Sequence, residues 1–63
     1  MRLTPPQCHA LLLAYDRQYA RQDAIHPQTL ESLLAHDLAG SADPVYWLTY
    51  DGHRAAERLL AKP

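Results

Sequence analysis

Residues 45–56 read VYWLTYDGHRAA and contain a strand signal and a helix signal that meet at Thr49. The five residues from Val45 to Thr49 have high β propensity and favour a strand. Thr49 is a good N-cap for a helix that we expect to run from about Tyr50 to Ala61. Gly52 would cost this helix up to about 1 kcal/mol relative to alanine. We therefore expect close backbone contact between Gly52 and the neighbouring strands.

Two more helices are predicted upstream, each from a recognisable start signal. Thr4-Pro5-Pro6-Gln7 has the spacing of a capping box, and we expect the helix that it opens to end near Ala20. The second helix should begin at Pro27, with His26 as its cap. Asp37 is a suitable terminator in the left-handed conformation, because Asp and Asn tolerate positive φ better than most non-glycine residues.

The segment between the second and third helices predicts a hairpin. Leu38-Ala39-Gly40 is the candidate partner strand, and Gly40 to Pro44 reads as a turn. A two-stranded ribbon is marginal alone and needs helices to cover it. The sequence thus predicts one mainly α domain over residues 1–63, with three helices and a small two-stranded β-hairpin. The predicted core consists of Leu11, Leu12, Tyr15, Leu30, Leu33, Leu34, Leu38, Tyr46, Leu48, Leu59 and Leu60.

Composition excludes several classes of protein. Six Lys and Arg against seven Asp and Glu give a formal net charge of −1, which argues against a basic nucleic-acid coat or a membrane-seeking peptide. Cys8 is the single cysteine, so an intramolecular disulfide is ruled out. The longest apolar run, Ala10 to Tyr15, is too short for a transmembrane helix or a signal-peptide core. We therefore expect a cytoplasmic protein without a membrane partner.

Three segments together resemble a winged helix-turn-helix domain. Residues 46–56, YWLTYDGHRAA, resemble the wing and last helix of that family, in which a strand ending in Leu-Thr caps a helix and a glycine follows. Ile25 to Leu38 resembles its recognition-helix segment, and Leu3 to Gln7 resembles the opening of its first helix. Two features depart from the family pattern. Residues 21–26 are short for the extra helix usual at this place, and Asp37 stands where glycine is common.

The resemblance implies binding to DNA through the exposed face of the recognition helix. The side chains that would read base edges are Gln28, Thr29 and Ser32. The cations that could contact phosphates are Arg17, Arg21, Arg54 and Arg58. However, no Lys or Arg lies between Arg21 and Arg54, and affinity for duplex DNA depends largely on phosphate neutralisation. The arginines are therefore interpreted first as solvated helix faces, with phosphate contact as the alternative.

Catalytic and metal-binding interpretations find little support in the residues. Adjacent Cys8 and His9 point about 100° apart on a helix, so they cannot work as a nucleophile and its base. The histidines show no i, i+4 pair on one helix and no recognisable metal-ligand spacing. The chain also lacks a glycine-rich phosphate loop. We expect no enzymatic activity, no cofactor, no metal site and no small-molecule substrate.

The strongest candidate for binding is the outward side of the last strand. Tyr46 and Leu48 should point to the core, so Val45 and Trp47 should lie on the opposite side and be partly exposed. Leu13 also points away from the apolar stripe of its helix. We expect these three residues to contact a protein partner or a second copy, because tryptophan is strongly enriched among binding hot spots. The alternative is that Trp47 folds over a neighbouring helix and completes a thin core.

These features favour a non-enzymatic regulatory module that binds another protein with a winged-helix-like scaffold lacking a basic reading face. Small chains of this sort resemble phage or mobile-element accessory proteins that sequester a regulatory or host partner. The alternative function is a DNA-binding transcriptional regulator, acting as a dimer so that two weak half-sites add up.

Overall fold

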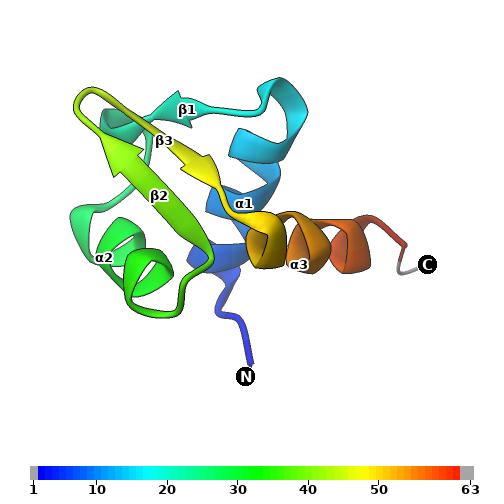
Figure 1. The fold of residues 1–63 in the computed structure, drawn as a ribbon. Coiled ribbons are helices and arrows are strands. Elements are labelled where there is room, and N and C mark those ends of the chain that lie inside the picture. Colours follow the sequence, from blue (N-terminus) through cyan, green and yellow to red (C-terminus); the bar gives the residue numbers. More distant parts are fainter. Residues whose placement is uncertain (1, 62–63) are drawn as a thin grey trace.

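The computed structural model describes residues 2–61 and contains three α-helices and a three-stranded antiparallel sheet (Figure 1). In chain order the elements are α1 (Pro5–Arg17), β1 (Ala20–Arg21), the 3-10 helix η1 (Gln22–Ala24), α2 (Pro27–Ala35), β2 (Ala39–Ala42), β3 (Val45–Leu48) and α3 (Tyr50–Ala61). A mainly helical fold with a small sheet is therefore confirmed. Within residues 2–61, no helix has the length and apolar character needed to cross a membrane.

The predicted helix starts are confirmed by their hydrogen bonds. Before α1, the Gln7 backbone N–H donates to Thr4 Oγ1 at 3.3 Å, and the Thr4 N–H donates to Gln7 Oε1 at 2.8 Å. His26 Nδ1 accepts the Gln28 N–H at the start of α2. At α3, Thr49 Oγ1 accepts the Gly52 N–H at 3.1 Å. Side chains thus satisfy backbone donors that each first turn leaves without an intrahelical partner.

Helix α1 is shorter than predicted, and its early end creates a third strand. It ends at Arg17 instead of Ala20, because Gln18 adopts the left-handed conformation with φ 71°. The chain then turns back, and residues 20–21 pair with β3 in the register Ala20–Tyr46. The expected two-stranded ribbon is therefore a three-stranded sheet of order β1-β3-β2.

The hairpin forms between β2 and β3, with a tighter turn than expected. Its register pairs Ala39 with Leu48 and Ala42 with Val45, so only Asp43 and Pro44 connect the two strands. The predicted start of the partner strand at Leu38 is one residue early. The left-handed conformation predicted for Asp37 is confirmed, with φ 59°.

A short helix also occupies the link that the sequence suggested was too short for one. Residues 22–24 form the single-turn helix η1, and the Gln22 N–H donates to the carbonyl of Pro44 at 2.9 Å. The element order is thus a helix, a short strand, a single-turn helix, a second α-helix, a hairpin and a final helix. This order is compatible with a winged-helix-like fold.

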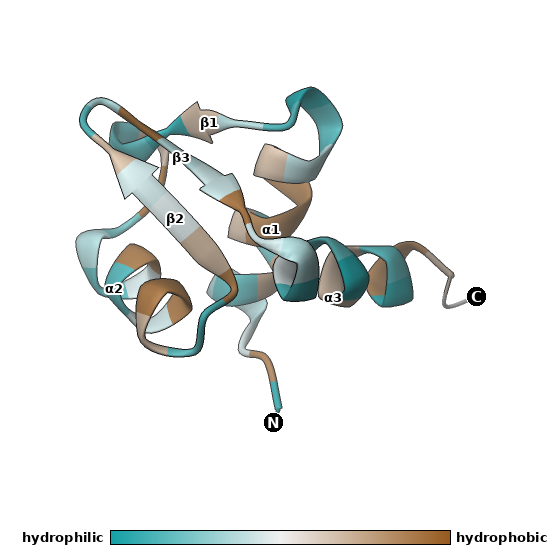
Figure 2. Cartoon of the chain, viewed as in Figure 1, coloured by the Kyte–Doolittle hydropathy of each residue, from teal (hydrophilic) through white to brown (hydrophobic). Residues whose placement is uncertain are grey.

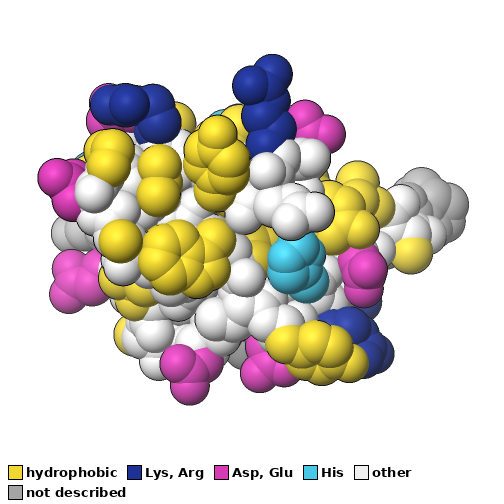
Figure 3. All heavy atoms as spheres, turned by 45° about the horizontal axis from the view of Figure 1, so that its top comes forward, with side chains coloured by type: hydrophobic (Ala, Val, Ile, Leu, Met, Phe, Trp, Pro, Cys, Tyr) yellow, Lys and Arg dark blue, Asp and Glu magenta, His cyan; other side chains and the backbone are white. Residues whose placement is uncertain are grey.

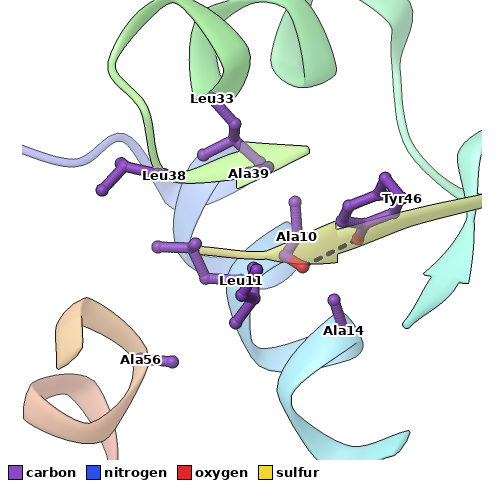
Figure 4. Packing of buried hydrophobic residues seen from close by; sticks show 9 residues of the cluster. Ala10, Leu11, Ala14, Leu33, Leu38, Ala39, Tyr46 and Ala56 are labelled. Carbon is purple, nitrogen blue, oxygen red and sulfur yellow. Dashed lines mark hydrogen bonds between the residues drawn. The ribbon is translucent and has the colours of Figure 1, made fainter. Parts of the chain in front are cut away.

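The core is built from small residues as much as from large ones. Figure 4 shows α1 packed under β3, where the Tyr46 hydroxyl donates to the Ala10 carbonyl at 2.7 Å. In Figure 2 the hydrophobic positions of α2 lie toward the sheet. The buried apolar residues are Ala10, Leu11, Ala14, Leu33, Leu38, Ala39, Tyr46, Leu48 and Ala56.

The predicted core is correct for its centre and wrong at two positions. Leu11, Leu33 and Tyr46 are fully buried. Leu34 and Leu60 are exposed, at 37% and 58% of their surface. The other predicted members are buried or packed partly buried against the cluster. The two errors lie in α2 and near the end of α3.

Gly52 makes the close backbone contact that its position predicted. A Cβ atom built at this glycine would overlap the carbonyl oxygen of Leu38 and approach Leu48 Cβ to 3.2 Å. The start of α3 therefore lies directly against the point where β2 begins.

Candidate interaction surface

The two sides of the sheet have different neighbours. Tyr46 and Leu48 point inward, and Tyr46 contacts α1 through its hydroxyl. Val45 and Trp47 alternate with them and therefore point outward. Figure 3 turns this side toward the viewer and shows hydrophobic side chains grouped at its centre, with charged side chains at the margins. One side of the sheet is thus covered by helices, and the other is open and apolar.

Trp47 is the largest side chain on the open side. It remains 40% exposed, and its indole lies against its cross-strand partner Gly40. A Cβ atom at Gly40 would lie 2.6 Å from Trp47 Nε1 and 2.8 Å from Cε2. The indole therefore rests on the backbone of β2 and stays partly open to solvent. It does not complete the core between the helices.

Tyr19 belongs to the same surface, although it falls within the first helix as predicted, which was expected to end near Ala20. Because α1 ends at Arg17, Tyr19 immediately precedes β1. The pairing of Arg21 with Val45 sets the register, and continuing it by two residues brings Tyr19 next to Trp47. Tyr19 is 56% exposed. We name Tyr19, Ala42, Val45 and Trp47 the outer sheet face.

Leu13 does not join the outer sheet face. It is 37% exposed, but it projects from α1, which packs on the inward side of the sheet through Ala10 and Tyr46. The sheet therefore separates Leu13 from Trp47. The three residues predicted to bind a partner are thus divided into a pair on the outer sheet face and an isolated leucine on the opposite side.

An ion pair marks the margin of the outer sheet face. Arg21 Nη2 lies 3.1 Å from Asp23 Oδ2, and Arg21 Nε also donates to this carboxylate. The hydrogen bond from Arg21 lowers the pKa of Asp23, and the same contact raises the pKa of Arg21. Both side chains are largely exposed, so the pair contributes little to stability. The pairing with Asp23 engages the Arg21 guanidinium, which was a candidate for phosphate contact.

The residues predicted to read DNA differ in how far they are exposed. Gln28 is exposed, but Thr29 and Ser32 are half-buried. Ser32 Oγ accepts from Gln7 Nε2 at 2.8 Å and donates to the Thr29 carbonyl at 2.9 Å. The Ser32 hydroxyl is thus engaged in connecting α2 to α1.

Two of the other predicted phosphate contacts, Arg54 and Arg58, lie apart from Gln28. Arg17 is the last residue of α1. Arg54 and Arg58 are exposed on α3 and line a hollow that reaches α2 only at His36, the residue that follows the helix. Arg54 and Arg58 are thus placed near the C-terminal end of α2, whereas Gln28 lies at its start.

Residues that could support chemistry are dispersed. Cys8 is a half-buried free thiol, and residues 2–61 contain no group of three His, Cys, Asp or Glu side chains able to hold a metal ion. A hollow of about 580 Å³ lies between η1, α2 and the β2–β3 turn, with Ile25 and Leu30 among its lining residues. These features define no catalytic constellation in the described part of the chain.

Comparisons of the chain with known protein families, with curated protein sequences and with solved structures give no significant match. Functional inference for this protein therefore rests on the geometry of its own residues. The feature that stands out among them is the outer sheet face.

Proposed function

We propose that this protein is a small, non-enzymatic regulatory module that binds another protein through the outer sheet face of a winged-helix-like scaffold. The observation that carries the proposal is the placement of Trp47, which lies 40% exposed on the side of the sheet that no helix covers. The proposed class is the accessory or inhibitor type found in phages and mobile elements.

The energetic argument concerns the apolar character of that face. An antiparallel sheet with one side in water normally alternates between apolar inward and polar outward residues. Here Val45 and Trp47 occupy two successive outward positions of β3, and Tyr19 lies beside them. Leaving these side chains in water forgoes burial energy, on the order of 1–3 kcal/mol for a large apolar side chain. A partner that covers the face would recover it.

The Trp47 side chain is also held in place before binding. Its contact with Gly40 restricts the indole, so less side-chain entropy is lost when a partner packs against it. Tryptophan and tyrosine are enriched among residues that dominate binding energy. Trp47 and Tyr19 are therefore proposed as the anchors of the interface, with the Arg21–Asp23 pair in its polar rim.

The second candidate function is a DNA-binding regulator, favoured by the element order around α2. Against it, the sequence supplies no Lys or Arg between Arg21 and Arg54, and Ser32 is committed to Gln7. Phosphate neutralisation supplies most of the affinity of non-specific DNA binding. The protein-binding function is therefore the one that the side chains of α2 and the sheet support better.

The proposal is tested by affinity capture from a lysate of the native host with three versions of the tagged protein. Trp47→Lys places a charge on the outer sheet face, and Leu13→Lys places the same charge at a similarly exposed leucine on the other side of the sheet. We expect a protein captured by the wild type and by Leu13→Lys but not by Trp47→Lys. Capture by Trp47→Lys at the wild-type level would refute the assignment of this face.

Two further measurements separate the alternatives. Sedimentation at about 10–100 μM protein determines whether the partner is a second copy, in which case Trp47→Lys is expected to abolish the dimer. Titration with random and genomic duplex DNA at about 50 mM salt is expected to show no binding. Tight binding with a steep salt dependence would instead support the DNA-binding regulator.

A further inference from the structure

A second surface lies on the part of the molecule where the N-terminal segment passes between the end of α2 and α3 (Figure 1). These segments enclose an open groove of about 760 Å³. Its rim carries three exposed arginines, Arg2, Arg54 and Arg58. Its floor contains the buried Leu38 and the half-buried Leu3 and Leu59. The groove thus combines an apolar floor with a basic rim.

The concentration of positive charge in this groove is unexpected for an acidic chain. The whole protein has a formal net charge of −1 with six basic residues, and half of these line the groove with a single acidic residue, Asp51. Among residues 2–61, the one ion pair joins Arg21 and Asp23. The three groove arginines therefore lack a carboxylate partner within the described part of the chain.

One of these arginines is also oriented. Arg54 Nη1 donates to the Tyr50 hydroxyl at 3.0 Å, and its guanidinium lies 5.8 Å from the centre of the Tyr50 ring. Arg54 and Arg58 are four residues apart on α3, so their side chains leave the same face of the helix. The remaining N–H groups of both guanidinium groups can face a ligand in the groove.

We propose that this groove binds an acidic peptide segment of a partner protein, with carboxylates on both sides of an apolar side chain. Guanidinium groups form paired hydrogen bonds with carboxylates, and the leucine floor accepts the apolar side chain between them. A nucleic-acid backbone satisfies the arginines but offers nothing apolar for Leu3, Leu38 and Leu59. The chemistry of the floor therefore favours a peptide. The inference does not depend on the outer sheet face.

The proposal is tested by titrating ¹⁵N-labelled protein with the acetylated hexapeptide Glu-Leu-Glu-Glu-Leu-Glu and following the backbone amide signals. We expect saturable shifts at groove residues such as Leu3, Ala55 and Leu59, which weaken at about 0.5 M salt. The matched peptide with glutamine at every glutamate is expected to bind at least about tenfold more weakly. Trp47→Lys is expected to bind the acidic peptide as the wild type does.

Matched variants locate the site. Arg54→Gln with Arg58→Gln should weaken binding of the acidic peptide about tenfold, because two rim charges are lost. Arg17→Gln with Arg21→Gln removes the same charge elsewhere and should leave binding unchanged. Thermal melts establish that both double variants are folded, as expected for exposed positions.

Several outcomes would overturn the proposal. These are equal binding of the glutamine peptide, shifts spread over the whole protein, or equal weakening in both double variants. A competition experiment with a 12-base-pair DNA duplex gives a further outcome. If the duplex displaces the acidic peptide at a concentration below the Kd of the peptide, the groove binds nucleic acid instead.

Discussion

The indole of Trp47 lies against the backbone of Gly40, its partner in the β2–β3 ladder. Across an antiparallel pair, a glycine opposite an aromatic residue leaves room for the ring to lie over the strand. This contact keeps the indole on the sheet while leaving 40% of the side chain in solvent. The pair therefore determines how the outer sheet face presents its largest residue.

Gly40→Ala should displace the indole without unfolding the protein. The new Cβ would lie 2.6 Å from Trp47 Nε1, so the ring must swing toward solvent. The cost should stay within about 1 kcal/mol, because alanine is also the better strand residue. Trp47 is the only tryptophan, so its fluorescence emission should shift to longer wavelength. Ser41→Ala on the same strand is the control, and an unchanged emission maximum in Gly40→Ala would contradict the prediction.

Gly52→Ala, in contrast to Gly40→Ala, should strongly destabilise the protein. Replacing a helical glycine with alanine ordinarily stabilises a helix by about 1 kcal/mol. Here the added methyl group would overlap the Leu38 carbonyl oxygen, which is backbone and cannot move aside. We expect a loss of about 3 kcal/mol or more, enough to unfold much of a protein of this size. Urea denaturation measures it against Glu57→Ala, an exposed change on α3. A stabilised Gly52→Ala protein would refute the contact.

Tyr46 should make stability depend on alkaline pH. Burial raises the pKa of its hydroxyl to about 12, above the unfolded value of about 10. A raised pKa means that the protonated form is favoured in the folded state. The contribution is thus complete below pH 10 and is lost as the pH rises toward 12. Linkage gives a loss of about 1 kcal/mol by pH 11.

Tyr46→Phe removes both the titration and the hydrogen bond to the Ala10 carbonyl. We expect it to be less stable than the wild type by about 1 kcal/mol at pH 7. The difference between the two proteins should shrink between pH 10 and 11.5 in denaturant titrations. A difference that stays constant over this range would show that the Tyr46 hydroxyl does not carry the alkaline dependence.

The contact between Gln7 and Ser32 should be energetically coupled. Gln7 is buried, and its Nε2 donates to Ser32 Oγ at 2.8 Å. Ser32→Ala leaves this amide without that acceptor, which should cost about 1–2 kcal/mol. Gln7→Leu alone removes the donor to the Ser32 hydroxyl, which keeps its own bond to the Thr29 carbonyl, and weakens the capping box. In a double-mutant cycle, the pair should lose about 1 kcal/mol less than the sum of the single losses. Simple additivity would mean that the contact contributes nothing.

The parts of the fold that were predictable from sequence are those set by local chemistry. Thr4, His26 and Thr49 each supply an acceptor to the first turn of a helix, and such caps act within three residues. The left-handed conformation of Asp37 is likewise a local preference. The outward position of Trp47 followed from strand alternation. These features depend on neighbours in sequence, so their positions could be read directly.

The features that were missed depend on contacts distant in sequence. The two residues of β1 carry no pattern of their own and become a strand only by pairing with β3. Tyr19, which falls within the first helix as predicted, consequently lies on the outer sheet face instead. Glutamine has no strong preference for the left-handed conformation, so the end of α1 at Gln18 could not be predicted from the sequence. Ala10, Ala14 and Ala56 are fully buried. The spacing of large apolar residues does not predict such positions, because small residues are buried where helix backbones approach closely.

The central place of β3 also sets the order in which the sheet can assemble during synthesis. Residues 20–21 leave the ribosome early, yet their partners Val45 and Tyr46 are added 24 or more residues later. Until then β1 has no strand to pair with, and the hydrogen bond from Tyr46 to α1 cannot form. A nascent chain stopped before Val45 lacks β3, so it contains the first two helices but no sheet to pack them on. We therefore expect the protein to fold in a single step late in translation, after β3 has been synthesised. Nascent chains that end before β3 should not resist proteolysis.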